Sequence, residues 1–173
     1  DKNNLPGGVR WRRVVEFSGG DWIQLQDGTV RHTVFAYYLS VSCNHCQDPI
    51  CVTCCPSGAM TQDRFGIVSI NPETCIGCRY CEWACPYSAP QFDPVKGRMT
   101  KCDFCRDDLV RNKTPACVAA CPTRALGYGE LDQLIAQYGN NQEMAPLPHH
   151  EFTQPCLVLI LHGQAKSLQT KDG

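Results

Sequence analysis

Cysteines dominate the chemistry that this sequence could perform, because they make up 14 of its 173 residues. Twelve fall into three groups of four that each end in Cys-Pro-x-x-Ala. The first, second and third quartets are Cys43, Cys46, Cys51 and Cys55; Cys75, Cys78, Cys81 and Cys85; and Cys102, Cys105, Cys117 and Cys121. At roughly 8 % of a short chain, cysteine indicates a disulfide scaffold or a metal protein. The repeated ending predicts three related structural units.

The second quartet has the most informative spacing, C-x2-C-x2-C-x3-C-P. This is the run of bacterial ferredoxins, in which three thiolates on a tight loop wrap three corners of an iron–sulfur cube. The fourth cysteine, which precedes a proline, ligates the other cluster of a two-cluster ferredoxin. The second quartet therefore predicts 4Fe-4S chemistry.

The same exchange rule pairs the first two quartets. It assigns two ligand sets, Cys43, Cys46, Cys51 and Cys85 for one cluster and Cys75, Cys78, Cys81 and Cys55 for the other. Cys54 and Cys55 are adjacent, and we choose Cys55 because it precedes Pro56 and keeps the x3 spacing. Cys54 is interpreted as a small buried thiol packed against a cluster. These two quartets predict one unit with two neighbouring clusters.

The third quartet has a stretched loop, C-x2-C-x11-C-x3-C-P. Under the exchange rule, the cluster at Cys102, Cys105 and Cys117 lacks a fourth ligand, and Cys121 is a ligand of another cluster. The chain has no initiator methionine and no signal peptide, so we expect a processed or truncated chain whose fourth quartet precedes residue 1. Four clusters are then expected in the intact protein, two of them completed within these residues. Alternatively, all four cysteines of the third quartet hold one cluster.

Two other uses of cysteine compete with iron–sulfur ligation. Disulfides fit poorly, because closely spaced C-x2-C pairs have unfavourable geometry for bridging. Zinc requires only two ligand pairs and leaves the additional cysteine of each short loop unexplained. Taken alone, the third quartet is compatible with a four-cysteine zinc site or a zinc-stabilised interaction module.

Composition and motifs exclude several other functions. A net charge of -1 predicts no strong attraction to nucleic acid or anionic lipid. The longest apolar run, residues 156–161, is far shorter than the roughly 20 residues that span a bilayer. The sequence has no recognisable nucleophile–base pair, phosphate-binding loop, or flavin or nicotinamide fingerprint. It therefore predicts an electron carrier without a catalytic site of its own.

The expected fold is a loop-rich α+β arrangement of tandem bacterial-ferredoxin-like 4Fe-4S units with short strands and helices. We divide the chain into a strand-rich segment (1–34), two 4Fe-4S units (35–65 and 66–95), the third quartet (96–127), and a helix followed by a C-terminal strap (128–173). Two or three strands are expected within 1–42, and one near 65–71. A helix is predicted around 131–138 with Gly139 as its C-cap, followed by an apolar strand at 156–162.

Several residues near the quartets receive supporting roles. Ile50, Val52, Ile76 and Trp83 are expected to pack around the ligands and exclude water. His45 is interpreted as a structural histidine or, alternatively, as a hydrogen-bond donor to a cluster or a group facing a quinol site. Cys156 is expected to be a core thiol, whereas the remaining histidines considered have no ligand spacing: His149, His150 and His162.

Residues 96–124 have seven lysines and arginines against three aspartates. This excess is either a solvated or subunit-facing surface, or a field that favours the reduced cluster. Substitution of Arg111 or Lys113 is expected to distinguish the two interpretations through the cluster potentials.

The stretches "GGDW", "VFAYYLSVSCNHCQDPICVTCCPSGAM", "CIGCRYCEWACPYSAPQ", "KGRMTKCDFC" and "APLPHHEFTQP" resemble the four-cluster iron–sulfur subunits of molybdopterin oxidoreductases, most closely those of anaerobic dimethyl sulfoxide reductases. The resemblance implies 4Fe-4S clusters and two partners, a membrane anchor that oxidises quinol and a molybdopterin catalytic subunit. The expected function is the relay of single electrons between them for reduction of dimethyl sulfoxide or related S- and N-oxides. The alternative substrates are polysulfide, thiosulfate or another oxyanion. We expect a location peripheral to the cytoplasmic membrane through these partners, and favour its periplasmic side.

Overall fold

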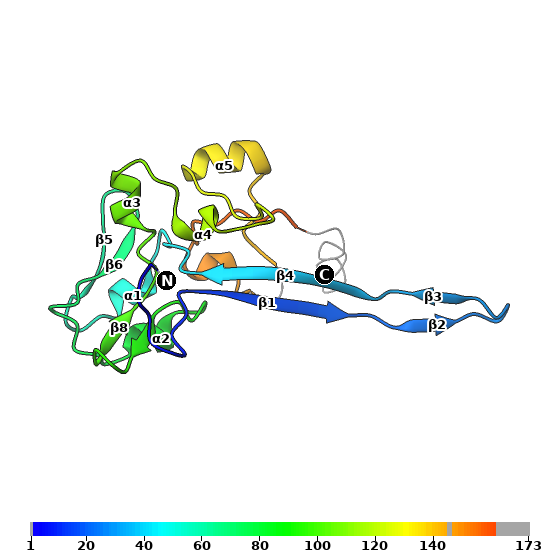
Figure 1. Ribbon diagram of the computed structural model, residues 1–173, viewed down its shortest axis with the longest axis horizontal. Coiled ribbons are helices and arrows are strands. Elements are labelled where there is room, and N and C mark those ends of the chain that lie inside the picture. Colours follow the sequence, from blue (N-terminus) through cyan, green and yellow to red (C-terminus); the bar gives the residue numbers. More distant parts are fainter. Residues whose placement is uncertain (1, 145–146, 162–173) are drawn as a thin grey trace.

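The computed structural model describes residues 2–144 and 147–161. Figure 1 shows two parts, a long two-stranded arm and a body. The cysteines all belong to the body. We call residues 12–42 the arm, and residues 43–144 with 147–161 the body. All the strands in the described part of the chain pair antiparallel, two by two. Short strands, short helices and many loops agree with the expected α+β class.

The arm is one interrupted hairpin. β1 (Arg12–Gly19) pairs with β4 (Phe35–Ser42), and farther out β2 (Trp22–Gln24) pairs with β3 (Val30–His32). The sequence predicted two or three strands here, but the structure has four, because the ladder breaks at Gly20. Gly20 has φ +91°, and a Cβ there would lie 2.2 Å from the Thr33 carbonyl oxygen. Only glycine allows this crossing.

The body contains two short hairpins. β5 (Met60–Gln62) pairs with β6 (Val68–Ile70), and β7 (Gln91–Asp93) pairs with β8 (Arg98–Thr100). β6 confirms the strand predicted near 65–71. Met60, Val68, Cys81 and Met99 form a small buried core between the hairpins and the cysteine loops. The two hairpins therefore support the cysteine loops that pack against them.

The helices are short. They are α1 (Ile50–Thr53), α2 (Tyr80–Ala84), α3 (Arg106–Val110), α4 (Ala116–Ala119), α5 (Leu131–Tyr138) and the 3-10 helix η1 (His150–Phe152). The helix predicted at 131–138 is confirmed as α5, with Gly139 at its C-cap and a φ of +86°. None of the helices in the described ranges is long and apolar enough to cross a membrane.

The C-terminal segment is a strap, but its predicted apolar strand is wrong. Residues 156–161 are irregular, because they lie against loops and not against a free strand edge. The Cys156 amide donates to the Asn44 carbonyl (3.1 Å), and the Leu159 amide donates to the Asn141 carbonyl (2.7 Å). Leu159 and Leu161 pack on the buried cluster of Tyr37, Leu39 and Met144. His162 lies outside the described residues.

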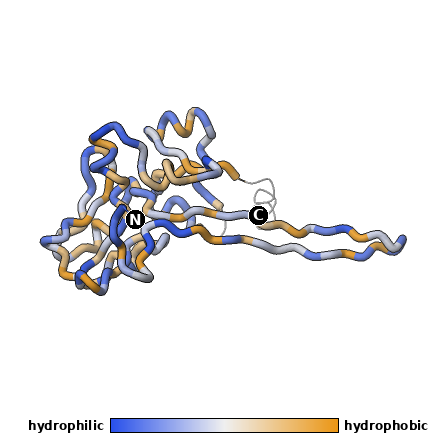
Figure 2. Tube along the Cα trace, in the orientation of Figure 1, coloured by the Kyte–Doolittle hydropathy of each residue, from blue (hydrophilic) through white to orange (hydrophobic). Residues whose placement is uncertain are grey.

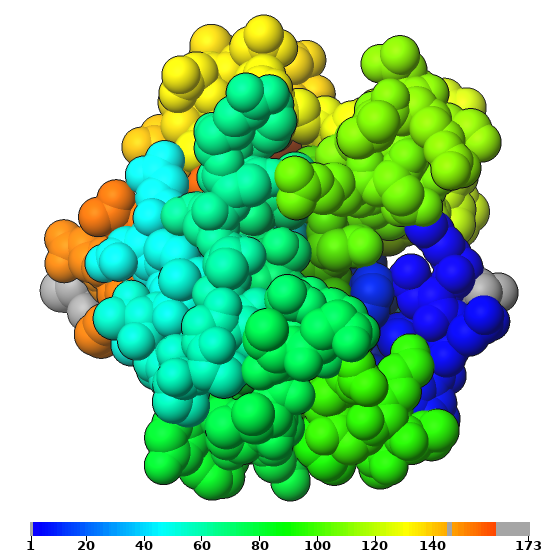
Figure 3. Space-filling model, turned by 90° about the vertical axis from the view of Figure 1, so that its left-hand side faces the viewer, coloured from blue at the N-terminus to red at the C-terminus, as the bar shows by residue number. Residues whose placement is uncertain are grey.

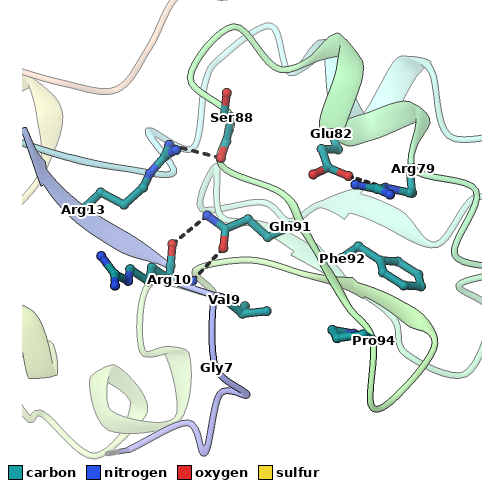
Figure 4. Close-up of a pocket in the computed structure, with 11 residues that line it drawn as sticks. Gly7, Val9, Arg10, Arg13, Arg79, Glu82, Ser88, Gln91, Phe92 and Pro94 are labelled. Carbon is teal, nitrogen blue, oxygen red and sulfur yellow. Dashed lines mark hydrogen bonds and ion pairs between the residues drawn. The ribbon is translucent and has the colours of Figure 1, made fainter.

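The first residues of the chain pack against the body. Arg10 and Gln91 exchange two hydrogen bonds, and the Arg13 guanidinium donates to the carbonyls of Tyr87 and Ser88. These contacts surround a surface hollow whose other wall holds the Arg79–Glu82 ion pair (2.7 Å; Figure 4). The hydrogen bonds around the hollow hold the base of the arm against the second quartet's unit. No cysteine lines the hollow.

Candidate metal centres

All three quartets have the same local backbone, although their sequences differ. In each C-x2-C pair, the residue before the second cysteine is left-handed: His45, Gly77 and Phe104 have φ +45°, +70° and +59°. In each unit the third cysteine is the second residue of a short helix, α1, α2 or α4. The stretched loop of the third quartet is accommodated by α3 without changing this pattern.

The repeated Cys-Pro-x-x-Ala ending forms a turn around the sulfur of its cysteine. The residue before the alanine is left-handed in every unit, at Gly58, Ser88 and Arg124. In this turn, the backbone N–H groups of the second and fourth residues after the last cysteine donate to the sulfur of that cysteine. The sulfurs concerned are those of Cys55, Cys85 and Cys121. Such donors stabilise a thiolate. The third quartet therefore shares the donor geometry of the other two.

Four cysteines from the first two quartets line one pocket, at Cys55, Cys75, Cys78 and Cys81, with Met60, Ile70 and Met99 among its walls. Three of these cysteines come from the second quartet and one from the first. Burial, followed by the charges of neighbouring thiols, raises the pKa of Cys81 to about 12. At Cys55, burial favours the thiol, but hydrogen bonds from the Met60 amide and from Ser57 outweigh it and lower the pKa.

Cys43, Cys46, Cys51 and Cys85 form a second neighbourhood. Burial raises the pKa of Cys46 to about 11 and that of Cys51 to about 12, and the thiols of Cys43 and Cys85 add to both rises. These four sulfurs are thus close enough for their charges to interact. Three are from the first quartet and one from the second, in the reciprocal arrangement of a two-cluster ferredoxin.

The donor sets fit 4Fe-4S clusters. Each is made of four sulfur atoms that are partly or fully shielded from water, and the lining of the pocket at Cys55, Cys75, Cys78 and Cys81 contains no carboxylate. Thiolate is the ligand that such clusters use. Cys54 lies beside this arrangement, where it packs against the buried core and its thiol is near the Cys51 carbonyl oxygen (3.6 Å). It does not line the pocket that Cys55 lines.

The third quartet starts beside the first. Burial raises the pKa of Cys102 to about 11, and the Cys43 thiol adds to this rise. Cys105 is buried, and Cys117 and Cys121 are partly exposed. Cys121 contacts the Thr123 hydroxyl (3.5 Å), which, together with backbone N–H groups, lowers its pKa.

The beginning of the chain lies against the third quartet. The Lys2 ammonium pairs with Asp107 (3.0 Å) and with the Asp108 carboxylate on α3, and its charge acts on Cys105. In Figure 3 the N-terminal residues lie next to the yellow-green residues of this region. Sequence reasoning did not predict this contact, because a single lysine carries no spacing signal.

His45 is buried, and its Nδ1 accepts a hydrogen bond from the Val68 amide (3.0 Å). Its ring packs edge-on against Phe104, with centroids 5.2 Å apart. Nε2 has no hydrogen-bond partner among the described residues. Burial, with help from the Lys101 charge, lowers the pKa of His45 to about 3, so the ring is neutral and Nε2 carries its proton. The bond with Val68 agrees with a structural role, and the buried N–H is compatible with the alternative of a hydrogen-bond donor to a cluster.

The shielding role expected of the apolar residues is only partly correct. Val52 packs against the core, but Ile50, Ile76 and Trp83 are exposed, with Trp83 at 71 %. Ile76 nevertheless lines the pocket of Cys55, Cys75, Cys78 and Cys81, whereas Ile50 and Trp83 do not. Cys156 is half-buried near Cys43 and is not part of a strand.

Glu143, His149 and His150 form a cluster that spacing did not predict. One oxygen of Glu143 contacts His149 Nε2 (3.0 Å) and His150 Nδ1. The hydrogen bond with His150 lowers the pKa of Glu143. Because this single oxygen already joins both rings, the cluster is interpreted as a polar contact that holds the strap.

Comparisons with known proteins agree with this donor geometry. The family of 4Fe-4S dicluster domains matches residues 34–131, more than half of the chain. The chain is 50 % identical over 159 residues to the B subunit of anaerobic dimethyl sulfoxide reductase from Haemophilus influenzae, covering 92 % of this chain and 78 % of that protein. It is also 50 % identical to the Escherichia coli K12 protein of the same name, with 92 % and 77 % covered. A Salmonella typhi thiosulfate reductase electron transfer subunit is 45 % identical over 97 residues, 56 % of this chain and 50 % of that protein. The chain therefore belongs to the 4Fe-4S dicluster proteins and, among them, to the family of anaerobic dimethyl sulfoxide reductase B subunits.

Proposed function

We propose that this chain relays single electrons through 4Fe-4S clusters, from a quinol-oxidising membrane anchor to a molybdopterin subunit that reduces dimethyl sulfoxide or a related S- or N-oxide. One observation carries this proposal. Two groups of four sulfurs lie together, and each takes three cysteines from one quartet and one from the other. That reciprocal exchange keeps two clusters close, as an electron relay requires.

The proposed ligand sets follow the exchange. One cluster is held by Cys43, Cys46, Cys51 and Cys85, and the next by Cys75, Cys78, Cys81 and Cys55. The units 35–65, 66–95 and 96–127 are thus tandem ferredoxin-type units. For the third quartet, its matching backbone supports iron–sulfur ligation over zinc.

Cys102, Cys105 and Cys117 are proposed to hold a third cluster with one thiolate from a fourth quartet, to which Cys121 contributes in return. The contact of Lys2 with α3 supports this proposal, because residues upstream of Lys2 would emerge beside Cys105. A chain with four quartets then carries four clusters. A cluster held by Cys102, Cys105, Cys117 and Cys121 together would contradict this proposal.

The protein's own part in the relay is to hold and shield the sulfurs. A bound 4Fe-4S cluster accepts and releases one electron without making bonds to a substrate. The Cys-Pro-x-x-Ala turns present backbone N–H groups to three of the ligand sulfurs, and hydrogen bonds of this kind raise a cluster's potential. Met60, Val68 and Met99 keep water from the inner side.

The partners in this proposal are the membrane anchor and the molybdopterin subunit, with this chain peripheral to the cytoplasmic membrane through them. We place the complex on the periplasmic side. The test is accessibility of the subunit to protease in intact spheroplasts, where protection would place it on the cytoplasmic side.

The relay is tested on the complex purified without oxygen. Its clusters are reduced with dithionite, and their re-oxidation is followed by absorbance and electron paramagnetic resonance after dimethyl sulfoxide is added. We expect rapid re-oxidation by dimethyl sulfoxide. Re-oxidation by thiosulfate or polysulfide alone would favour the alternative substrate class, which the shorter match to a thiosulfate reductase subunit suggests. Zinc in place of iron and acid-labile sulfide would contradict the relay altogether.

A further inference from the structure

Lys101 is a buried cation. It follows β8 and directly precedes Cys102, and only 4 % of it is exposed. Its ammonium donates to the carbonyl of Val68 on β6 and to the carbonyl of Cys102 (2.7 Å). Both acceptors are neutral, and no carboxylate lies within ion-pair distance of Lys101 among the residues that the structure describes. Asp63 acts on His45 through its charge, as Lys101 does, but the Asp63 carboxylate is paired with Arg106 (3.1 Å) and not with Lys101.

A buried ammonium without an anion is unfavourable, because burial removes its hydration without a compensating charge. The other basic residues of 96–124 avoid this cost. Arg111 and Lys113 are exposed, and Lys96 pairs with Asp93 (3.7 Å) while remaining 57 % exposed. Lys101 therefore requires a separate explanation for its position.

The Lys101 ammonium lies between the cysteine loops of two quartets. One of its acceptors is the Cys102 carbonyl, and the other belongs to Val68, whose amide donates to His45 between Cys43 and Cys46. Burial raises the pKa of Cys51, Cys85 and Cys102, and in each case the Lys101 charge works in the opposite direction. Cys51 and Cys85 belong to the first proposed cluster, and Cys102 to the third. A 4Fe-4S cluster with four thiolate ligands carries net negative charge, which becomes more negative on reduction.

We propose that Lys101 is a shared counter-cation of the cluster at Cys43, Cys46, Cys51 and Cys85 and of the cluster that begins at Cys102. This assignment rests on the proposed relay. A fixed positive charge stabilises the reduced form of both clusters and raises their potentials, since net charge is one of the protein's means of setting them. Lys101 thus makes both clusters easier to reduce. We expect a smaller effect at the cluster of Cys55, Cys75, Cys78 and Cys81.

The test compares midpoint potentials in the full complex, measured by redox titration with electron paramagnetic resonance. Lys101→Gln removes the charge but keeps an N–H donor for one carbonyl. We expect two clusters to become about tenfold harder to reduce, which for one electron corresponds to a fall of about 59 mV, while the other potentials change less. Lys101→Arg keeps the charge and should leave the potentials near those of the wild type. Lys113→Gln, an exposed change in the same basic segment, is the matched control.

Iron and acid-labile sulfide are measured in every variant, which separates this inference from the relay itself. Absence of clusters from the wild-type protein would overturn the relay. Intact clusters with unchanged potentials in Lys101→Gln, or equal shifts in the Gln and Arg variants, would overturn the role of Lys101 alone. If Lys101→Gln does not retain its clusters, Lys101→Met is measured in its place. Loss in both neutral variants but not in Lys101→Arg supports the counter-cation, and loss in all three overturns it.

Discussion

The arm and the body of this protein are stabilised in opposite ways. The arm extends away from the rest of the molecule (Figure 1), and Trp22, Val14 and Tyr38 are 70 %, 67 % and 66 % exposed. Figure 2 shows polar and apolar residues mixed along both sides of this hairpin. A two-stranded ribbon of this kind is marginal by itself. It is held at its base, where Tyr37 and Leu39 pack on Met144.

The body has little regular structure and few buried apolar residues, yet it places four sulfurs around a common pocket. Where ligands take the place of a hydrophobic core, metal binding and folding are linked. The comparison therefore suggests that metal stabilises the body, whereas strand pairing and one small apolar contact stabilise the arm. The following three experiments test that division, in decreasing order of the change we expect.

Cys51→Ala should have the strongest consequence, because it removes one proposed ligand from a buried cluster. We expect loss or conversion of that cluster, measured as a fall in iron and sulfide and a changed electron paramagnetic resonance spectrum. Cys54→Ala is the matched control, three residues away on the same segment, and should keep all its iron. Equal losses in the two variants would mean that the ligand sets are wrong at this position.

Leu39→Ala should have an intermediate effect, confined to the base of the arm. Leu39 is 9 % exposed within an apolar cluster, and leucine-to-alanine changes in cores cost about 2–5 kcal/mol. We expect a lower midpoint of thermal unfolding without loss of iron. Val14→Ala on β1, where the side chain is exposed, should cost less than about 1 kcal/mol. Similar costs at both positions would show that the arm has no buried anchor.

Shortening the arm should affect the body least. Because Gly19 and Phe35 are paired in the ladder, residues 20–34 can be replaced by Asn-Gly, the preferred two-residue hairpin turn. Iron content and the thermal midpoint should stay as in the wild type. A loss of iron would contradict the division between the arm and the body, since it would mean that the distal strands help to hold the clusters.

Local features were predicted well from the sequence, and features that depend on distant contacts were not. The α5 helix and Gly139 were correct, because helical spacing and a terminal glycine are signals within a few residues. The strand at 156–161 was wrong, since an apolar run predicts burial but not which backbone lies beside it. The exposure of Ile50 and Trp83 was missed for a similar reason, as position between two ligands does not reveal which side of a loop faces inward.

The three quartets and the likeness of their endings can be read from the sequence alone, because the ligands of a tight loop are separated by two or three residues and the Cys-Pro-x-x-Ala turn is local. The same spacing identifies which cysteines are candidates to be exchanged between units. The burial of Lys101 against Val68, the enclosure of His45 by Phe104 and the reach of Lys2 to α3 became visible in the folded chain only. Burial and charge at those positions are set by chain segments 33, 59 and 105 residues apart, and no pattern within a single segment records such contacts.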